Sequence, residues 1–367
     1  MSAEDDVLIE QRDGLGLITL NRPKAINALN YAMVKEITPV LEAWATDDAI
    51  RAVVVTGNGE RGLCAGGDIV SIYHDAKDGG SESHDFWRDE YILNAMIGRY
   101  PKPYVVVMDG IVMGGGVGLS AHGNNRIVTE RSKIGMPEVG IGFVPDVGGT
   151  WLLAHAPGET GTHVALTTNT MTAGDAIALG FADHYVPTEK VPALLDALHG
   201  GEVGEVVRRF AESAPESDLM AQRDWIDECY AGDVVEDIVA RLQARPEPEA
   251  AAAAESILAK SPTSLKVTLR SLRRAAQAAS LEEVLNDEYR VSIRCLAAPD
   301  MVEGIRAQVV EKDRNPKWSP AELAEVSPER VDEYFADLGE LELGLRPPAV
   351  VGVGRDGQLG NGREGQL

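Results

Sequence analysis

Cysteine is scarce in this 367-residue sequence, which contains only three. Cys64, Cys229 and Cys295 lie far apart, and no CxxC pair or Cys/His cluster with metal-ligand spacing accompanies them. A scattered, odd-numbered set favours neither a disulfide framework nor a structural zinc site. We therefore expect free cysteines and no metal. A nucleophilic role for Cys64 is disfavoured as well, because no histidine stands in a recognisable partner motif and a free cysteine is usually a small buried hydrophobe.

Basic residues are also few, since 34 Lys and Arg against 58 Asp and Glu give a formal net charge of -24. Nucleic acid is bound by basic surfaces that displace its counterions, so this balance argues against a nucleic-acid partner. An anionic ligand would need a local basic patch. The segment SPTSLKVTLRSLRRAAQ offers one, with Lys266, Arg270 and Arg273 on one face at helical spacing and Arg274 beside them. The simpler interpretation is a solvated helix face whose leucines pack inward.

Long apolar runs are missing too. No early segment joins a basic region to an apolar run, and the uncharged stretches are strand-length or interrupted by glycine. This pattern predicts neither a signal peptide nor a transmembrane helix, so we expect a cytoplasmic protein without membrane contact. The hydrophobic content of 44% is nevertheless sufficient for a large buried core.

The apolar patterns that are present alternate between strands and helices. We predict a hairpin in VLIEQRDGLGLITL, a helix over 30–45, buried strands in AVVVTG and YVVVM, and a helix followed by a strand in TAGDAIALGFADHYV. Such alternation indicates an α/β core, which we place at 1–199. Charged, alanine-rich helical patterns fill 200–343, and the glycine-rich tail at 344–367 has too few apolar groups to offset the entropy of ordering it.

Two glycine-rich loops follow the predicted strands, GLCAGGDI at 62–69 and MGGGVGLS at 113–120. Glycine lets main-chain N–H groups face a ligand at close approach, and two such amides would form an oxyanion hole for a carbonyl oxygen. Neither loop has the GxGxxG or GxxxxGK[ST] spacing of a nucleotide-binding turn. Taken alone, each is also compatible with a purely structural turn. We expect Asp68 to anchor the first loop through local bonds from its side chain to the backbone.

Five segments occur in a characteristic order: LNRPKAINALN, GLCAGGDI, DGIVMGGGVGLS, MPEVGIGFVPDVGGT and MTAGDAIALGFADHYV. Over residues 8–187 the chain resembles the crotonase, or enoyl-CoA hydratase/isomerase, superfamily. The resemblance implies a spiral of ββα units with a helical C-terminal region, a catalytic core that binds an acyl-CoA thioester, and oxyanion-hole amides at Gly67 and Gly115. Similar proteins are often trimers, so a homo-oligomer is one expectation, although the long C-terminal region leaves the assembly state open.

The acidic residues of MPEVGIGFVPDVGGT distinguish the reactions found in this superfamily. Similar hydratases have two glutamates, at the positions matched by Gly118 and Glu138, and a glycine in place of Asp146. Similar dienoyl-CoA isomerases also need an acid at the Gly118 position. The combination found here resembles a thioester-hydrolysing branch, as do SPTSLKVTLRSLRRA, EVLNDEYRVS and EGIRAQVVEKDRNPKWSPA. The likeness implies hydrolysis of 3-hydroxyisobutyryl-CoA to 3-hydroxyisobutyrate and CoA, a step of valine degradation. An enoyl-CoA hydratase or isomerase is the alternative, and a catalytically silent CoA-binding protein is the third hypothesis.

Thioester hydrolysis requires a polarised carbonyl and a nucleophile. Glu138 suits either direct attack or activation of water. Asp146 suits binding of the substrate's 3-hydroxyl, positioning of water or protonation of the departing thiolate, because two acids in a desolvated pocket push one pKa upward. From the residues alone, Glu138 is equally compatible with the start of a helix and Asp146 with an ordinary turn.

The resemblance adds three substrate-binding candidates. It implies that Glu90 faces the substrate, that Asp68 lies in the substrate-binding loop and that Lys24 lies along CoA. Lys266 and the arginines that follow it are further candidates for the CoA phosphates. No metal or redox cofactor is implied, because CoA is part of the substrate.

Overall fold

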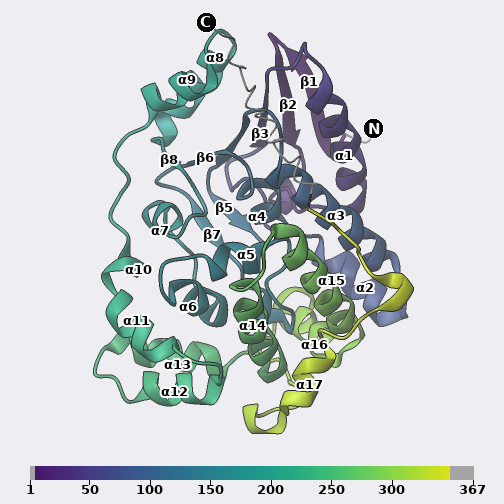
Figure 1. The fold of residues 1–367 in the computed structure, drawn as a ribbon, viewed down its shortest axis with the longest axis vertical. Coiled ribbons are helices and arrows are strands. Elements are labelled where there is room, and N and C mark those ends of the chain that lie inside the picture. Colours follow the sequence, from purple (N-terminus) through teal and green to yellow (C-terminus); the bar gives the residue numbers. More distant parts are fainter. Residues whose placement is uncertain (1–4, 348–367) are drawn as a thin grey trace, which may run out of the picture.

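The computed structural model describes residues 5–347 (Figure 1). The strands are β1 (Val7–Arg12), β2 (Leu15–Leu20), β3 (Ala52–Gly57), β4 (Tyr104–Met108), β5 (Ile111–Met113), β6 (Asn125–Val128), β7 (Lys133–Gly135) and β8 (His184–Tyr185). The helices are α1 (Tyr31–Thr46), α2 (Ile69–Asp78), α3 (Glu82–Gly98), α4 (Gly115–Ser120), α5 (Gly149–Ala154), α6 (Thr160–Thr167), α7 (Ala173–Ala178), α8 (Val191–Leu198), α9 (Val203–Phe210), α10 (Asp218–Ala221), α11 (Arg223–Tyr230), α12 (Val235–Gln243), α13 (Pro248–Leu258), α14 (Pro262–Ala275), α15 (Leu281–Ala297), α16 (Pro299–Ile305) and α17 (Pro328–Glu333). Short helical turns are η1 (Pro23–Ala25), η2 (Glu138–Ile141), η3 (Thr188–Lys190), η4 (Arg306–Val310), η5 (Leu323–Glu325) and η6 (Gly339–Leu341).

The main sheet has six strands in the order β1-β2-β3-β4-β6-β8. β1 and β2 form the expected antiparallel hairpin, and the other neighbouring pairs are parallel. The hairpin turns through Asp13 and Gly14, both in the left-handed region with φ of 52° and 76°. This is the conformation that asparagine, aspartate and glycine tolerate in a two-residue turn.

A second, smaller layer of strands completes the predicted spiral. β5 pairs with β7 in parallel, and isolated bridges from Cys64 to Val112 and from Ile134 to Met171 extend this layer. β4 and β6 of the main sheet are thus each followed by a short strand of the second layer and then by a helix or helical turn. The α/β fold and its ββα units are confirmed.

The C-terminal half is helical, as its alanine-rich and charged patterns indicate. Between β8 and residue 347 the structure contains no further strand. In Figure 1, α14, α15, α16 and α17 lie together below the strands. One hydrophobic core extends from Val7 to Leu343, so the helical region and the sheets share buried surface.

The predicted tail falls mostly on residues 348–367, which lie outside the described part of the chain. Ahead of them, Leu345 exchanges hydrogen bonds with the side chain of Asn286.

Within residues 5–347, no helix combines the length and apolar content needed to cross a bilayer. The proposed division at residues 199 and 343 stays a prediction.

Candidate active site

The two glycine-rich loops meet at Gly67 and Gly115. A Cβ atom built on Gly115 would lie 3.4 Å from the Gly67 nitrogen. Gly115 is the first residue of α4, where main-chain N–H groups have no partner within the helix. In residues 5–347 neither the Gly67 nor the Gly115 N–H donates a hydrogen bond to another backbone group. Two unused amides side by side are the arrangement that binds a carbonyl oxyanion.

Two buried glutamates flank this pair of loops. The Oε1 atom of Glu90 lies 2.7 Å from a Cβ built on Gly115, and Oε1 of Glu138 lies 2.9 Å from one built on Gly114. Glu90 is 2% and Glu138 6% exposed. Oε1 of Glu90 and Oε2 of Glu138 have no hydrogen-bond partner within the described chain. Free carboxylate oxygens beside the amide pair are therefore available to a ligand.

Asp146 follows η2 and is held by a tyrosine from α3. The Tyr91 hydroxyl donates to Asp146 Oδ2 at 2.7 Å and shares a second hydrogen bond, also 2.7 Å, with the Ser292 hydroxyl of α15. Burial raises the pKa of Asp146 to about 7, although the Tyr91 hydrogen bond lowers it. Burial and the neighbouring Asp146 also raise the pKa values of Glu90 and Glu138 well above the usual range. The three acids therefore share a desolvated site in which not all of them can be ionised together.

The turn after Asp146 is strained and is held by several distant groups. Val147 has φ of 53°, a left-handed conformation that a β-branched residue rarely adopts. The Glu288 carboxylate of α15 accepts from the Gly148 N–H at 2.6 Å, the Thr150 N–H at 3.0 Å and the Thr150 hydroxyl at 2.5 Å. The His122 ring contacts the Val147 carbonyl oxygen at 2.7 Å. These contacts fix the backbone that aims Asp146 at the site.

Gly118 occupies a closed position on α4. A Cβ there would lie 2.7 Å from both Asn94 Nδ2 and Val147 Cβ. Any larger side chain would have to displace one of them. The strained turn therefore also fills the space in front of Gly118.

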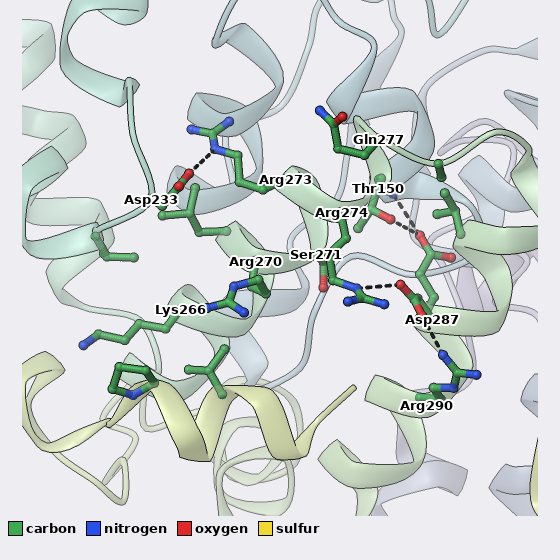
Figure 2. Close-up of a pocket in the computed structure, with 18 of the residues that line it drawn as sticks. Thr150, Asp233, Lys266, Arg270, Ser271, Arg273, Arg274, Gln277, Asp287 and Arg290 are labelled. Carbon is green, nitrogen blue, oxygen red and sulfur yellow. Dashed lines mark hydrogen bonds and ion pairs between the residues drawn. The ribbon is translucent and has the colours of Figure 1, made fainter. Parts of the chain in front are cut away.

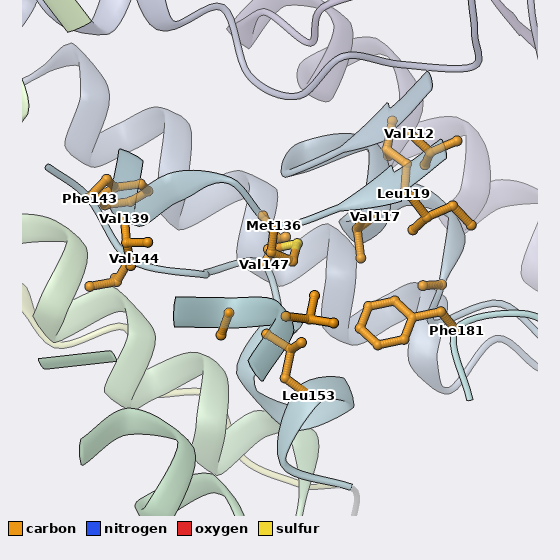
Figure 3. Packing of buried hydrophobic residues seen from close by; sticks show 14 of the residues in the cluster. Val112, Val117, Leu119, Met136, Val139, Phe143, Val144, Val147, Leu153 and Phe181 are labelled. Atoms are coloured by element: carbon orange, nitrogen blue, oxygen red, sulfur yellow. The ribbon is translucent and has the colours of Figure 1, made fainter. Parts of the chain in front are cut away.

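The acids lie in an apolar environment. Figure 3 shows Val139, Phe143 and Val144 grouped together in the segment after Glu138, with Met136 nearer to Val147. The Phe143 ring stacks on Trp87 of α3 with centroids 5.3 Å apart. Such surroundings exclude water and strengthen charge interactions inside the site.

Asp68 and Cys64 lie in the first glycine-rich loop, and Lys24 lies in the segment before it. The contacts of Asp68 differ from those expected. The expectation that Asp68 bonds locally to the backbone is wrong: its Oδ2 accepts from Arg22 Nη2 at 3.0 Å, and it makes no side-chain cap of α2. Arg22 reaches this carboxylate because its own loop lies alongside the CAGGD loop. Lys24 is exposed in η1. Cys64 is buried, and burial raises the pKa of its thiol to about 12, so it is not primed as a nucleophile.

The basic residues after SPTS line a cavity of about 840 Å³ (Figure 2). The lining includes Thr150 and Glu288 but not Glu90, Glu138 or Asp146, so the cavity lies behind the Asp146 turn. Each basic side chain of α14 is already paired with a carboxylate, as follows: Lys266 with Glu236 at 2.6 Å, Arg270 with Asp332 at 2.6 Å, Arg273 with Glu159 at 2.9 Å, and Arg274 with Asp287 at 2.7 Å. The leucines of the same helix are buried, as predicted.

Known proteins are similar to this chain over most of its length. A family model described as enoyl-CoA hydratase/isomerase matches residues 15–335. The 3-hydroxyisobutyryl-CoA hydrolase of Danio rerio is 41% identical over 94% of this chain and 92% of its own length, and that of Homo sapiens is 39% identical over 93% and 91%. This chain belongs to the 3-hydroxyisobutyryl-CoA hydrolase family. That family lies within the enoyl-CoA hydratase/isomerase superfamily, as the motifs indicated.

Two solved structures are also similar over most of their length. One from Mycobacterium thermoresistibile, described as a carnitinyl-CoA dehydratase, is 56% identical, with a TM-score of 0.90 over 93% of this chain and 98% of its own. One from Rhodobacter sphaeroides, described as an enoyl-CoA hydratase, is 44% identical, with a TM-score of 0.88 over 93% and 100%. The fold is therefore shared by proteins described with different activities, and the site must distinguish them.

The expectation of a cytoplasmic location is contradicted, because the curated relatives are named as mitochondrial enzymes. The expectation rested on the lack of secretory and membrane-spanning patterns. Such patterns do not distinguish the cytosol from an organelle interior.

Several residues of the site were not identified from sequence. Tyr91 and Asn94 stand in the same EYILN segment as Glu90, and Glu288 and Ser292 stand in EYRVS. Glu90 and Asn94 are four residues apart in the first segment, and Glu288 and Ser292 are four apart in the second. That spacing places both members of each pair on one face and is the signal that could have indicated them.

Proposed function

We propose that this protein hydrolyses the thioester of 3-hydroxyisobutyryl-CoA to 3-hydroxyisobutyrate and CoA, the reaction class of its curated relatives and a step of valine degradation. The observation that carries the proposal is the placement of a free carboxylate, Glu138, beside the paired amides of Gly67 and Gly115. These amides would bind the thioester oxygen, and Glu138 would supply or generate the nucleophile.

Hydration of an enoyl double bond is the second candidate, favoured by how the two solved neighbours are described. The site of this chain supports it less well. The resemblance to hydratases requires a second glutamate at the position of Gly118, and here Asn94 and Val147 occupy the space that such a side chain would need. Without a glutamate at the Gly118 position, the acids beside the amide pair are better suited to transfer of the acyl group to water.

Two routes of attack are compatible with the position of Glu138. In the first, the carboxylate adds to the carbonyl carbon, the oxyanion collapses with loss of the CoA thiolate, and water cleaves the resulting mixed anhydride. In the second, Glu138 takes a proton from water as the water oxygen adds to the carbonyl carbon, and the oxyanion then collapses with loss of the CoA thiolate. Both routes place negative charge on the same oxygen and therefore use the same amide pair.

Asp146 would assist rather than attack, because one of its oxygens is bound by Tyr91. Its raised pKa, about 7, lets it hold a proton near neutral pH and deliver it to the departing thiolate. Glu90 is proposed to contact the acyl group and Lys24 the CoA moiety. No step of this scheme requires a metal or redox cofactor.

The decisive experiment offers the protein 3-hydroxyisobutyryl-CoA and crotonyl-CoA in parallel. Release of free thiol from the first, without loss of the enoyl absorbance of the second, is the expected result. Loss of enoyl absorbance without thiol release would replace hydrolysis by hydration. Mass spectrometry of rapidly quenched turnover then separates the two routes, because only direct attack gives an acyl adduct on Glu138. The Glu138→Gln variant is the control in both assays.

A further inference from the structure

Asn94 of α3 is a buried amide without hydrogen bonds. It is 0% exposed, and neither its Oδ1 nor its Nδ2 has a partner within residues 5–347. Each buried polar group left unpaired costs about 1–3 kcal/mol, so native proteins rarely retain one without a ligand, a water or a functional reason.

Another asparagine of the same protein shows what a structural role looks like. Asn27 is also 0% exposed, but its side chain accepts from the Arg22 N–H at 2.9 Å and donates to the carbonyl oxygens of Asn58 at 3.0 Å and Gly62 at 3.2 Å. Asn27 fixes a loop with all of these bonds. Within residues 5–347 the Asn94 side chain makes no such hydrogen bond to a loop.

The position of Asn94 relates it to the oxyanion loops. Glu90 and Asn94 are four residues apart on one face of α3, and Gly115 and Gly118 are three apart on one face of α4. Glu90 Oε1 is 2.7 Å from a Cβ built on Gly115, and Asn94 Nδ2 is 2.7 Å from one built on Gly118. The two helices therefore run alongside each other, and Asn94 lies about one helical turn, or roughly 5.4 Å, beyond the Glu90 position.

The chemistry of the amide indicates what it binds. Asn94 offers both a donor and an acceptor, whereas a carboxylate offers only acceptors when ionised. An alcohol can use both, since its hydroxyl donates one hydrogen bond and accepts others. In a 3-hydroxyacyl thioester the hydroxyl lies roughly 3–4 Å from the carbonyl carbon along the acyl chain. With the carbonyl at Gly115, a hydroxyl in that range and a hydrogen bond of about 2.8 Å match the offset between the two helix positions.

We propose that Asn94 is a substrate-binding residue that recognises the 3-hydroxyl of the acyl group. The inference rests on the proposed thioester hydrolysis and adds to it the group that distinguishes hydroxylated from plain acyl chains. A site built to hydrogen-bond a substrate hydroxyl rejects the analogue that lacks it, because the polar group of the site is then left unpaired.

The test compares 3-hydroxyisobutyryl-CoA with isobutyryl-CoA in the wild-type protein and in Asn94→Leu, by thiol release. We expect kcat/KM on 3-hydroxyisobutyryl-CoA to fall at least about tenfold more than kcat/KM on isobutyryl-CoA in the variant, so that the ratio between the two substrates drops by that factor. Asn94→Ala gives the same readout if the leucine variant does not fold. An equal loss on both substrates, which indicates a water-holding or purely structural role, would overturn the proposal, as would an unchanged ratio.

A matched control is Thr268→Val on α14. Thr268 is also 0% exposed, and its hydroxyl has no partner in the described part of the chain, so its variant likewise removes a buried polar group at nearly constant size. Its substrate ratio is expected to equal that of the wild type. Failure of the proposed function itself would appear differently, as absence of thiol release from either substrate by the wild-type protein.

Discussion

Replacing Glu288 by glutamine would test how the Asp146 turn is held. In the wild-type protein one carboxylate oxygen accepts from Gly148 and the other from Thr150. A glutamine keeps one acceptor but turns an NH₂ group toward an N–H donor. The Gly148 or Thr150 amide is then buried without a partner, which costs about 1–3 kcal/mol of unfolding free energy.

The same change should reduce activity beyond its effect on stability. The left-handed Val147 stores roughly 1–3 kcal/mol of backbone strain, comparable with the hydrogen bond that is lost. The turn is therefore expected to relax and to move Asp146. A displacement of about 1 Å can lower the rate about 10²-fold, so we expect kcat to fall at least tenfold with a smaller change in KM.

Glu282→Gln provides the matched control on the same helix. Glu282 is 6% exposed, compared with 2% for Glu288, and it pairs with Arg99 at 3.1 Å instead of with the turn. Urea unfolding and thiol release are measured for both variants. We expect both to lose stability and only Glu288→Gln to lose kcat. Full kcat in Glu288→Gln, or an equal loss in the control, would refute the assigned role of the turn.

Further predictions concern the acids and the glycines. Glu138→Gln should lower thiol release about 10²–10⁴-fold while CoA binding measured by calorimetry persists; normal turnover would remove Glu138 from the mechanism. Gly115→Ala should lower kcat, because its methyl group would lie 2.7 Å from Glu90 Oε1, and this is checked by kinetics alongside a thermal melt. Gly118→Glu should lower the melting temperature without creating hydration of crotonyl-CoA, whereas gain of hydration would show that the space can open. Because the pKa of Asp146 is raised to about 7, its contribution to stability should be present below about pH 4 and be lost as the pH rises through 7, with Asp146→Asn showing a flatter profile in urea unfolding.

Local elements were predictable because their signals lie within a few residues. The β1–β2 hairpin follows from Asp13 and Gly14 between alternating strands, and α1 begins where the Asn30 side chain caps the Met33 N–H. The glycine loops after β3 and β4 were likewise visible as breaks after apolar runs. Their convergence was expected from the resemblance to a known fold and not from the pattern of either loop.

The contacts that shape the site were not predictable, because they join distant segments. Glu288 and Gly148 are 140 residues apart, and Tyr91 and Ser292 are 201 apart. Nothing in the composition of VPDVGG indicates that Val147, the second of its two valines, adopts a left-handed conformation. The charges of α14 present the same difficulty, since the carboxylates that neutralise them come from several separate segments.

The distance in sequence between Glu288 and the turn that it holds also bears on synthesis of the chain. At about 5–20 residues per second, roughly 7–30 s separate the emergence of Gly148 from that of its anchor 140 residues later. During that interval the strained valine has no Glu288 to hold it. A ribosome-bound chain ending before α15 should therefore lack a competent acid cluster, and activity should appear only after α15 has been made.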